Sequence, residues 1–208
     1  MSSNAFKIVT GAHTQPRLAP VVAFPRADLD DAELVQRARD GHEWAHEAIY
    51  RRYVQRVAQV GRRLLNDPSE VDDVVQETFL IAFETIGKLA QPAALRGWLT
   101  RIAVHRVHRR YRWSRLARLW STTAQVLGSE SEISPDVTPE QRAELVRIDQ
   151  VLQRLPATVR TAWVLRSVLG DALEEVASAC GCSLATAKRR IAEAERHIGA
   201  HVTGEVTP

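Results

Sequence analysis

The chain has very few cysteines and no long apolar run. Only two of its 208 residues are cysteine, Cys180 and Cys182. One intervening residue does not match the spacing of a zinc-ligand pair, and no further cysteine exists to complete a site. We therefore expect two small core side chains in a reducing compartment rather than a redox switch.

Long apolar runs are also absent. No stretch of the sequence is apolar enough to span a membrane, and the N-terminus lacks a signal-peptide core, so the expected location is cytoplasmic. Histidines recur in pairs at helical spacing, but the sequence places no third ligand beside any pair: His42 and His46, His105 and His108, His197 and His201. We predict no metal, no cofactor and no catalytic residue, and hence a protein that is not an enzyme.

Lysine is scarce as well, because only Lys7, Lys88 and Lys188 occur among 28 basic residues. Nearly all positive charge is therefore carried by arginine, whose guanidinium group can donate two parallel hydrogen bonds to a phosphate or to a guanine. A GC-rich genome would give the same bias. The net charge of +3 is modest, so composition is compatible with a nucleic-acid partner without indicating one.

The hydrophobic pattern predicts an all-α protein made of two small helical domains joined by a flexible linker. Prolines interrupt residues 1–28, which we expect to be a disordered tail. Apolar residues then recur at helical spacing over 32–41, 44–65, 68–86 and 94–113, with a possible continuation to Trp120. The predicted domains are 29–113 and 140–201, with a linker at 114–139 and a tail at 202–208.

The end of the second domain has the pattern of a helix-turn-helix. Leu173, Val176 and Ala177 form one apolar side of a short helix, and Gly181 follows where the turn needs positive φ. Ser183 is placed to cap a second helix. That helix turns Leu184, Ala187, Ile191, Ala194 and Ile198 to one side and Thr186, Arg189, Arg190, Glu193 and Arg196 to the other. An ordinary amphipathic surface helix would show the same two faces, but the turn and cap favour a DNA-reading helix.

The helix predicted over 71–86 has an unusual outer face. Its core side is Val71, Val74, Val75, Thr78, Phe79, Ala82 and Ile86. On the opposite side Asp73, Gln76, Glu77 and Glu84 surround Leu80, with Phe83 nearby. An acidic face with an apolar centre suits a basic protein partner, although single exposed apolar residues are common on protein surfaces.

The next helix carries an arginine-rich stripe. Trp98, Arg101, His105, His108, Arg109 and Arg112 fall within one narrow arc, and no acidic residue occurs between Arg96 and Arg118. Such a stripe can track a phosphate backbone and stack an unpaired base on the aromatic ring. The alternative is a solvated face with Trp98 in the core. Eight arginines without a carboxylate should repel one another unless an anion compensates them.

Three motifs occur in one order: Asp72 to Phe79 (DDVVQETF), Arg96 to Ala103 (RGWLTRIA), and the block from Leu155-Pro156 to Arg190. Together they resemble the extracytoplasmic-function sigma factors of bacterial RNA polymerase, over residues 30–113 and 140–199. The resemblance implies that the two domains are sigma domains 2 and 4, which bind core RNA polymerase and direct promoter-specific transcription initiation.

The resemblance also assigns roles to residues. Asp73, Gln76, Glu77 and Leu80 would dock on the polymerase. Trp98, Arg101, His105, Arg109 and Arg112 would capture and melt the minus-ten element of promoter DNA. Ser183, Thr186, Lys188, Arg189 and Arg190 would read the minus-thirty-five element. An anti-sigma factor, often membrane-bound in that family, is an expected partner.

The chain departs from the family pattern at Ala185, Ala187 and Arg189 and in the loop from Lys88 to Pro92. Its promoter sequence is therefore not implied. A stand-alone helix-turn-helix regulator, which would form a homodimer on palindromic sites, is the alternative hypothesis.

Overall fold

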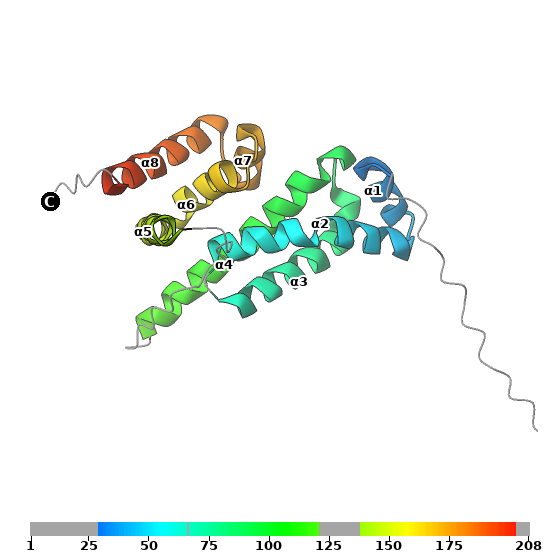
Figure 1. The fold of residues 1–208 in the computed structure, drawn as a ribbon. Helices are drawn as coiled ribbons and strands as arrows, with labels where there is room; N and C mark the ends of the chain where they lie inside the picture. Colours follow the sequence, from blue (N-terminus) through cyan, green and yellow to red (C-terminus); the bar gives the residue numbers. More distant parts are fainter. Residues whose placement is uncertain (1–28, 66, 121–137, 203–208) are drawn as a thin grey trace, which may run out of the picture.

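The computed structural model of the protein describes residues 29–65, 67–120 and 138–202. These residues are helical with no strand among them, which confirms the all-α fold class. The first helices are α1 (Asp31–Arg39), α2 (Glu43–Leu64), α3 (Pro68–Thr85) and α4 (Leu95–Trp120). The later helices are α5 (Pro139–Arg154), α6 (Ala157–Trp163), α7 (Leu173–Ala179) and α8 (Leu184–Val202) (Figure 1).

Side-chain caps set where several helices begin. The Asp30 carboxylate accepts a hydrogen bond from the Glu33 backbone N–H at 2.8 Å before α1. Asp67 does the same for the Ser69 N–H at 2.9 Å before α3, and Pro68 occupies the first turn, where its missing N–H costs nothing. Both signals act within one turn of the start of the helix, so they are local to the sequence.

The first four helices form one lobe around a shared apolar core. Helices α2, α3 and α4 pack against one another, and α1 lies across their end. Val57, Val74 and Leu99, one from each of these three helices, are at most 1% exposed. Arg39 of α1 donates to the carbonyl of Ile86 at 3.3 Å, which ties α1 to the turn that follows α3. Helix α4 is therefore held on two sides, by α2 and α3.

Helices α5 to α8 form a second lobe. Helix α8 packs on α5, α6 and α7 through small residues, and Ala162, Ala187 and Ala194 are fully buried. Helix α6 ends in one π-helical turn, Val164–Val168, which closes where the Leu169 N–H donates to the Val164 carbonyl at 3.0 Å. Among the helices described, none has the length and hydropathy needed to cross a lipid bilayer.

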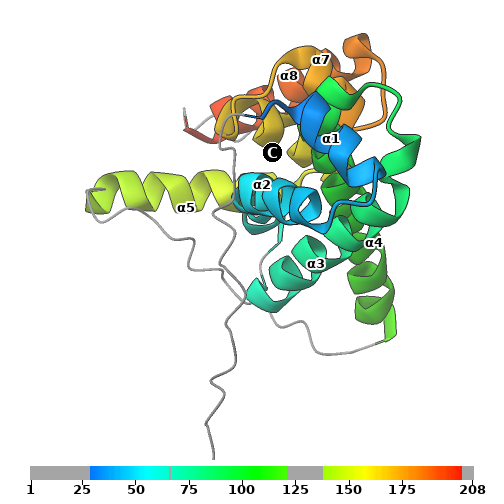
Figure 2. The ribbon, with the colours of Figure 1, turned by 90° about the vertical axis from the view of Figure 1, so that its right-hand side faces the viewer.

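The two lobes touch directly. Helix α7 packs on α4 (Figures 1 and 2). One cluster of buried apolar side chains is shared by both lobes. Residues 1–28, 121–137 and 203–208 lie outside the described part of the chain. The predicted disordered tail at 1–28, most of the predicted linker and nearly all of the C-terminal tail fall there, so those expectations stay predictions.

Candidate functional site

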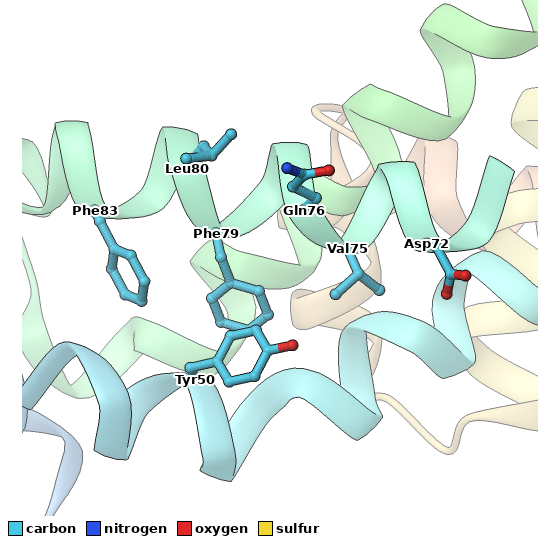
Figure 3. Close-up of a pocket in the computed structure, with 7 residues that line it drawn as sticks. All are labelled: Tyr50, Asp72, Val75, Gln76, Phe79, Leu80 and Phe83. Carbon is cyan, nitrogen blue, oxygen red and sulfur yellow. The ribbon is translucent and has the colours of Figure 1, made fainter. Parts of the chain in front are cut away.

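An apolar groove lies between the outer sides of α2 and α3. Its volume is about 450 Å³, and Figure 3 shows the lining side chains Tyr50, Asp72, Val75, Gln76, Phe79, Leu80 and Phe83. The ring centroids of Tyr50 and Phe79 are 4.7 Å apart, and those of Phe79 and Phe83 are 5.8 Å apart. A concave aromatic surface of this kind suits apolar side chains of another protein.

The four residues predicted to dock on the polymerase divide into two pairs. Gln76 and Leu80 are exposed and line the groove, and Leu80 is 55% exposed although it is apolar. Asp73 and Glu77 are ion-paired with α4 instead. Arg110 contacts Asp73 at 3.2 Å and Glu77 at 2.9 Å, and Arg106 lies 3.6 Å from Glu77. The acidic face is thus partly neutralised within the protein.

Tyr50 is the residue of the groove that sequence reasoning missed. It sits on α2 next to the buried Ile49, and 41% of it is exposed. A large aromatic residue that the helical period turns outward was the available signal. Tyr50 forms part of the groove only through its contact with Phe79, which lies nearly thirty residues later in the sequence.

The expectation that eight arginines of α4 lack carboxylate partners is wrong for three of them. Arg106 and Arg110 face the carboxylates of α3. Arg96 contacts Asp171 at 2.6 Å and Glu175 at 3.4 Å from the second lobe. A projection of a single helix cannot show these pairs, since every partner lies on another element. The compensation is therefore internal for part of the helix.

Four residues of the predicted stripe stay open to solvent. Arg101, His105, Arg109 and Arg112 are exposed, and the three arginines have no ion-pair partner in the described part of the chain. Burial, followed by the nearby Arg101, Arg106 and Arg112, lowers the pKa of His105. From Trp98 to Arg112 the stripe is about 21 Å long at 1.5 Å per residue.

Trp98 and His108 stand at the edges of the stripe. Trp98 is half-buried and packs against the apolar core, so part of its ring remains accessible. His108 turns toward the second lobe, where its Nε2 lies 2.9 Å from the Thr161 hydroxyl. Burial, and then His105, Arg112, Arg190 and Arg160, lower the pKa of His108 to about 4. His108 therefore contacts protein where the pattern had placed it on the stripe.

The helix-turn-helix forms as the sequence predicts. Gly181 has φ of 61°, the left-handed conformation that the turn requires. The Ser183 hydroxyl accepts a hydrogen bond from the Thr186 N–H at 3.2 Å, so Ser183 caps α8. Lys188 and Arg189 are exposed, while Thr186 and Arg190 are half-buried. Of the predicted inner face, Ala187, Ile191 and Ala194 are buried, but Leu184 is 38% exposed.

The two cysteines lie beside this turn. Both are free and partly buried, and both pack against the apolar core. Burial, with a smaller effect of Cys182, raises the pKa of the Cys180 thiol to about 11. A thiol in this environment stays protonated at neutral pH and is a poor nucleophile. No group of histidine, cysteine or carboxylate side chains in the described ranges could hold a metal ion.

Both signature regions match known families in the order in which the lobes occur. Residues 49–116 match Sigma-70 region 2, and residues 145–198 match Sigma-70, region 4. The chain is 31% identical over 179 residues to the RNA polymerase sigma factor NccH of Alcaligenes xylosoxydans xylosoxydans, covering 82% of this chain and 93% of NccH. It is 30% identical over 182 residues to the ECF RNA polymerase sigma-E factor of Haemophilus influenzae, covering 82% and 94% of the two chains.

Two solved structures share the fold. CnrH in complex with the cytosolic domain of CnrY is 27% identical, with a TM-score of 0.62 over 84% of this chain and 97% of CnrH. The sigma factor RpoE of Bartonella quintana, in complex with the anti-sigma factor NepR, gives a TM-score of 0.63 over 76% of this chain and 96% of RpoE at 18% identity. With both regions present in order and relatives matched across most of their length, the chain belongs to the extracytoplasmic-function sigma factors of bacterial RNA polymerase.

Proposed function

We propose that this sigma factor divides promoter recognition among three surfaces, one for the polymerase and two for DNA. It acts through binding energy alone: docking positions the polymerase, and contacts to DNA offset the cost of unstacking base pairs. The first lobe corresponds to sigma domain 2 and the second to sigma domain 4.

The polymerase-docking surface is the groove between α2 and α3. Gln76 and Leu80 carry the specific contacts, and the aromatic wall of Tyr50, Phe79 and Phe83 receives apolar side chains of the partner. Asp73 and Glu77 contribute charge at the border, shared with Arg106 and Arg110. The exposure of Leu80 supports this assignment because Leu80 adjoins the aromatic side chains of the groove, which makes a continuous exposed apolar surface.

The minus-ten surface is the stripe on α4. Arg101, Arg109 and Arg112 follow the phosphates of the melted strand, and the accessible edge of Trp98 stacks on an unpaired base. His105 is predominantly neutral at neutral pH because its pKa is lowered, so it offers a hydrogen bond rather than a charge.

The minus-thirty-five surface is the start of α8. Lys188 and Arg189 are exposed on the side away from the buried Ala187, as a helix in the major groove requires. Ser183, Thr186 and Arg190 complete the surface, with Ser183 and Thr186 joined by a hydroxyl–hydroxyl hydrogen bond of 2.9 Å. Of these residues, Arg189 is the one we propose to contact a base directly, since a guanidinium group can bind guanine through two hydrogen bonds.

An anti-sigma protein is the proposed regulatory partner. The structures of CnrH with CnrY and of RpoE with NepR are complexes of this kind. The groove beside Leu80 is the surface that such a protein would have to cover in order to compete with polymerase.

The observation that carries the proposal is the presence in one chain of an exposed apolar groove, an arginine stripe without carboxylate partners among the described residues, and a helix-turn-helix. In vitro transcription with purified core polymerase and a randomised promoter library tests it. We expect selection of two sequence elements at fixed spacing. A stable homodimer that binds palindromic sites and leaves core polymerase inactive would instead indicate a stand-alone regulator.

The docking surface has its own test. Leu80→Asp should abolish co-purification with core polymerase, because a carboxylate would be desolvated in an apolar contact. Val146→Asp is the matched control, since Val146 of α5 is also an exposed apolar helix residue, at 46%. Equal retention of polymerase by both variants would show that the groove does not dock it.

A further inference from the structure

The connection between α3 and α4, residues 86–94, is short and largely exposed. It consists of two 3₁₀ turns, Ile86–Lys88 and Pro92–Ala94. The side chains of Lys88 and Gln91 are both exposed on it. Hydrogen-bond geometry in a 3₁₀ turn is poorer than in an α-helix. The shape of the connection therefore depends on contacts with other elements.

Helix α1 supplies such contacts through Arg39, its last residue. The Arg39 Nε donates to the Ile86 carbonyl at 3.3 Å, and its Nη2 donates to the Leu89 carbonyl. Ile86 and Leu89 are buried, and α1 packs on both turns of the connection (Figure 1). Carbonyls at the end of a helix lack intrahelical donors, so a cationic donor is favourable there. One guanidinium group therefore holds the backbone of the first turn at both of its ends.

The connection continues the arginine stripe of α4. Counted back at 100° per residue from Trp98, Ala94 lies at about 320°, on the side of α4 that also carries Arg101 and Arg112. Ala94 is exposed and lies one helical turn before Trp98. A DNA strand that follows the stripe as far as Trp98 and continues in the same direction meets the connection next.

We propose that Arg39 is a positioning residue for minus-ten recognition. It holds the connection in the shape in which Lys88 and Gln91 meet the nucleotide next to the one that stacks on Trp98. This rests on the proposed function of the stripe. The Lys88 ammonium suits the phosphate of that nucleotide, and the Gln91 amide, which has a donor and an acceptor, suits a base edge. Arg39 acts only through the two carbonyls that it holds.

Fixing the connection in advance should strengthen DNA binding. Ordering a backbone segment costs conformational entropy, and a protein whose binding-competent shape is only partly populated loses apparent affinity by that fraction. Hydrogen bonds from a charged donor are stronger than those between neutral groups. Loss of both Arg39 hydrogen bonds should therefore weaken binding of the minus-ten strand about tenfold.

Fluorescence anisotropy of preformed holoenzyme with a single-stranded minus-ten oligonucleotide tests the role of Arg39. Arg39→Gln should weaken binding about tenfold, because a shorter neutral side chain cannot hold both carbonyls. Arg39→Lys keeps the charge but lacks the planar fork of donors, so it should restore part of the loss. Arg37→Gln makes the same chemical change at an exposed position of α1 and should bind as wild type does. If circular dichroism shows Arg39→Gln to be unfolded, Arg39→Lys replaces it in each measurement.

A double-variant cycle separates positioning from general stabilisation of the fold. In a chain that carries both Lys88→Ala and Gln91→Ala, adding Arg39→Gln should weaken binding less than about twofold, because the side chains that it positions are gone. A loss of about tenfold in both backgrounds would mean that Arg39 acts elsewhere, and would overturn the proposal.

Selection from the promoter library gives a second readout, which a merely structural role would not move. The position whose base preference is lost in Gln91→Ala should lose it in Arg39→Gln as well, while the other positions of both elements keep theirs. A loss of fold stability would lower activity on all promoters alike. An unchanged preference at that position in Arg39→Gln would contradict the proposal.

Hydrogen exchange in the free full chain measures the fixation without polymerase. The amides of residues 87–91 should exchange faster in Arg39→Gln than in wild type, and those of α2 should not change. Equal exchange in the connection would show that Arg39 does not fix it. Failure of wild-type holoenzyme to bind the oligonucleotide would contradict the proposed function and this proposal with it. Equally tight binding by wild type and Arg39→Gln would overturn only the role of Arg39.

Discussion

The arginines of α4 should differ in how they contribute to DNA binding, and salt dependence can measure the difference. Arg101, Arg109 and Arg112 are exposed and have no carboxylate partner within the described residues. Arg106 and Arg110 on the same helix are already paired with α3. Only the first three are free to release counterions from DNA phosphates. Replacement of each arginine by glutamine keeps a polar side chain of similar helix propensity and removes the charge.

The magnitude follows from counterion release. Each phosphate neutralised on a single strand contributes about 0.7 to the slope of log affinity against log salt concentration. Loss of all three free arginines should therefore reduce the slope by about 2.1. Between about 50 and about 200 mM salt, wild type should lose about 20-fold more affinity than the triple variant does. Arg106→Gln and Arg110→Gln should leave the slope within experimental error of wild type.

The assay is fluorescence anisotropy of preformed holoenzyme with a single-stranded oligonucleotide that carries the minus-ten element selected from the promoter library. Preformed holoenzyme keeps any effect of Arg106 or Arg110 on docking out of the measurement. A slope that falls equally for paired and free arginines would refute the argument, because it would mean that ion pairs to α3 do not withhold charge from DNA. An unchanged slope in the triple variant would remove α4 from the DNA interface.

Two predictions concern stability. A Cβ at Gly61 would lie 3.0 Å from Cγ1 of Val71, whose χ1 is fixed in a helix, so Gly61→Ala should destabilise the protein by about 1 kcal/mol in urea unfolding. A Cβ at Gly97 would meet nothing within 4 Å, so Gly97→Ala should stabilise the protein by about 1 kcal/mol. A change of the same sign in both variants would contradict the packing argument. The pKa of His108 is lowered to about 4 from 6.5, so its contribution to stability is complete above about pH 6.5 and is lost as pH falls toward 4. After discounting for its partial exposure, that loss should be about 2 kcal/mol in urea unfolding, and it should vanish in His108→Gln. An equally steep loss in that variant would assign the effect to another group. The charged and titratable groups that act on His108 come from three helices: His105, Arg112, Arg160 and Arg190.

Local signals predicted the helices and the turn of the second lobe. Asp67 and Pro68 mark the start of α3 because their side-chain acceptor and missing N–H act within one turn of the chain. Gly181 and Ser183 do the same for the helix-turn-helix. The exposure of Leu80 also follows from the helical period alone. These features depend on residues within four positions of each other, which a sequence displays directly.

Features that depend on two distant elements were not predictable in this way. The groove needs Tyr50 of α2 beside Phe79 of α3, and the buried ion-pair cluster needs Asp171 between Arg56 and Arg96. Nothing in the neighbourhood of Asp171 in the sequence distinguishes it from a solvated carboxylate before a helix. Its burial is a property of how the lobes pack, and so is the division of the α4 arginines into paired and free groups.

That division leaves the proposed DNA surface of α4 uncovered while the two lobes are in contact. At 100° per residue from Trp98, the side chains that meet α3, Arg106 and Arg110, lie at about 80° and 120°. Those that meet the second lobe, Arg96 and His108, lie at about 160° and 280°, and the stripe occupies about 300° to 20°. Each neighbour of α4 takes a separate sector, so Arg101, Arg109 and Arg112 stay exposed while the lobes are closed.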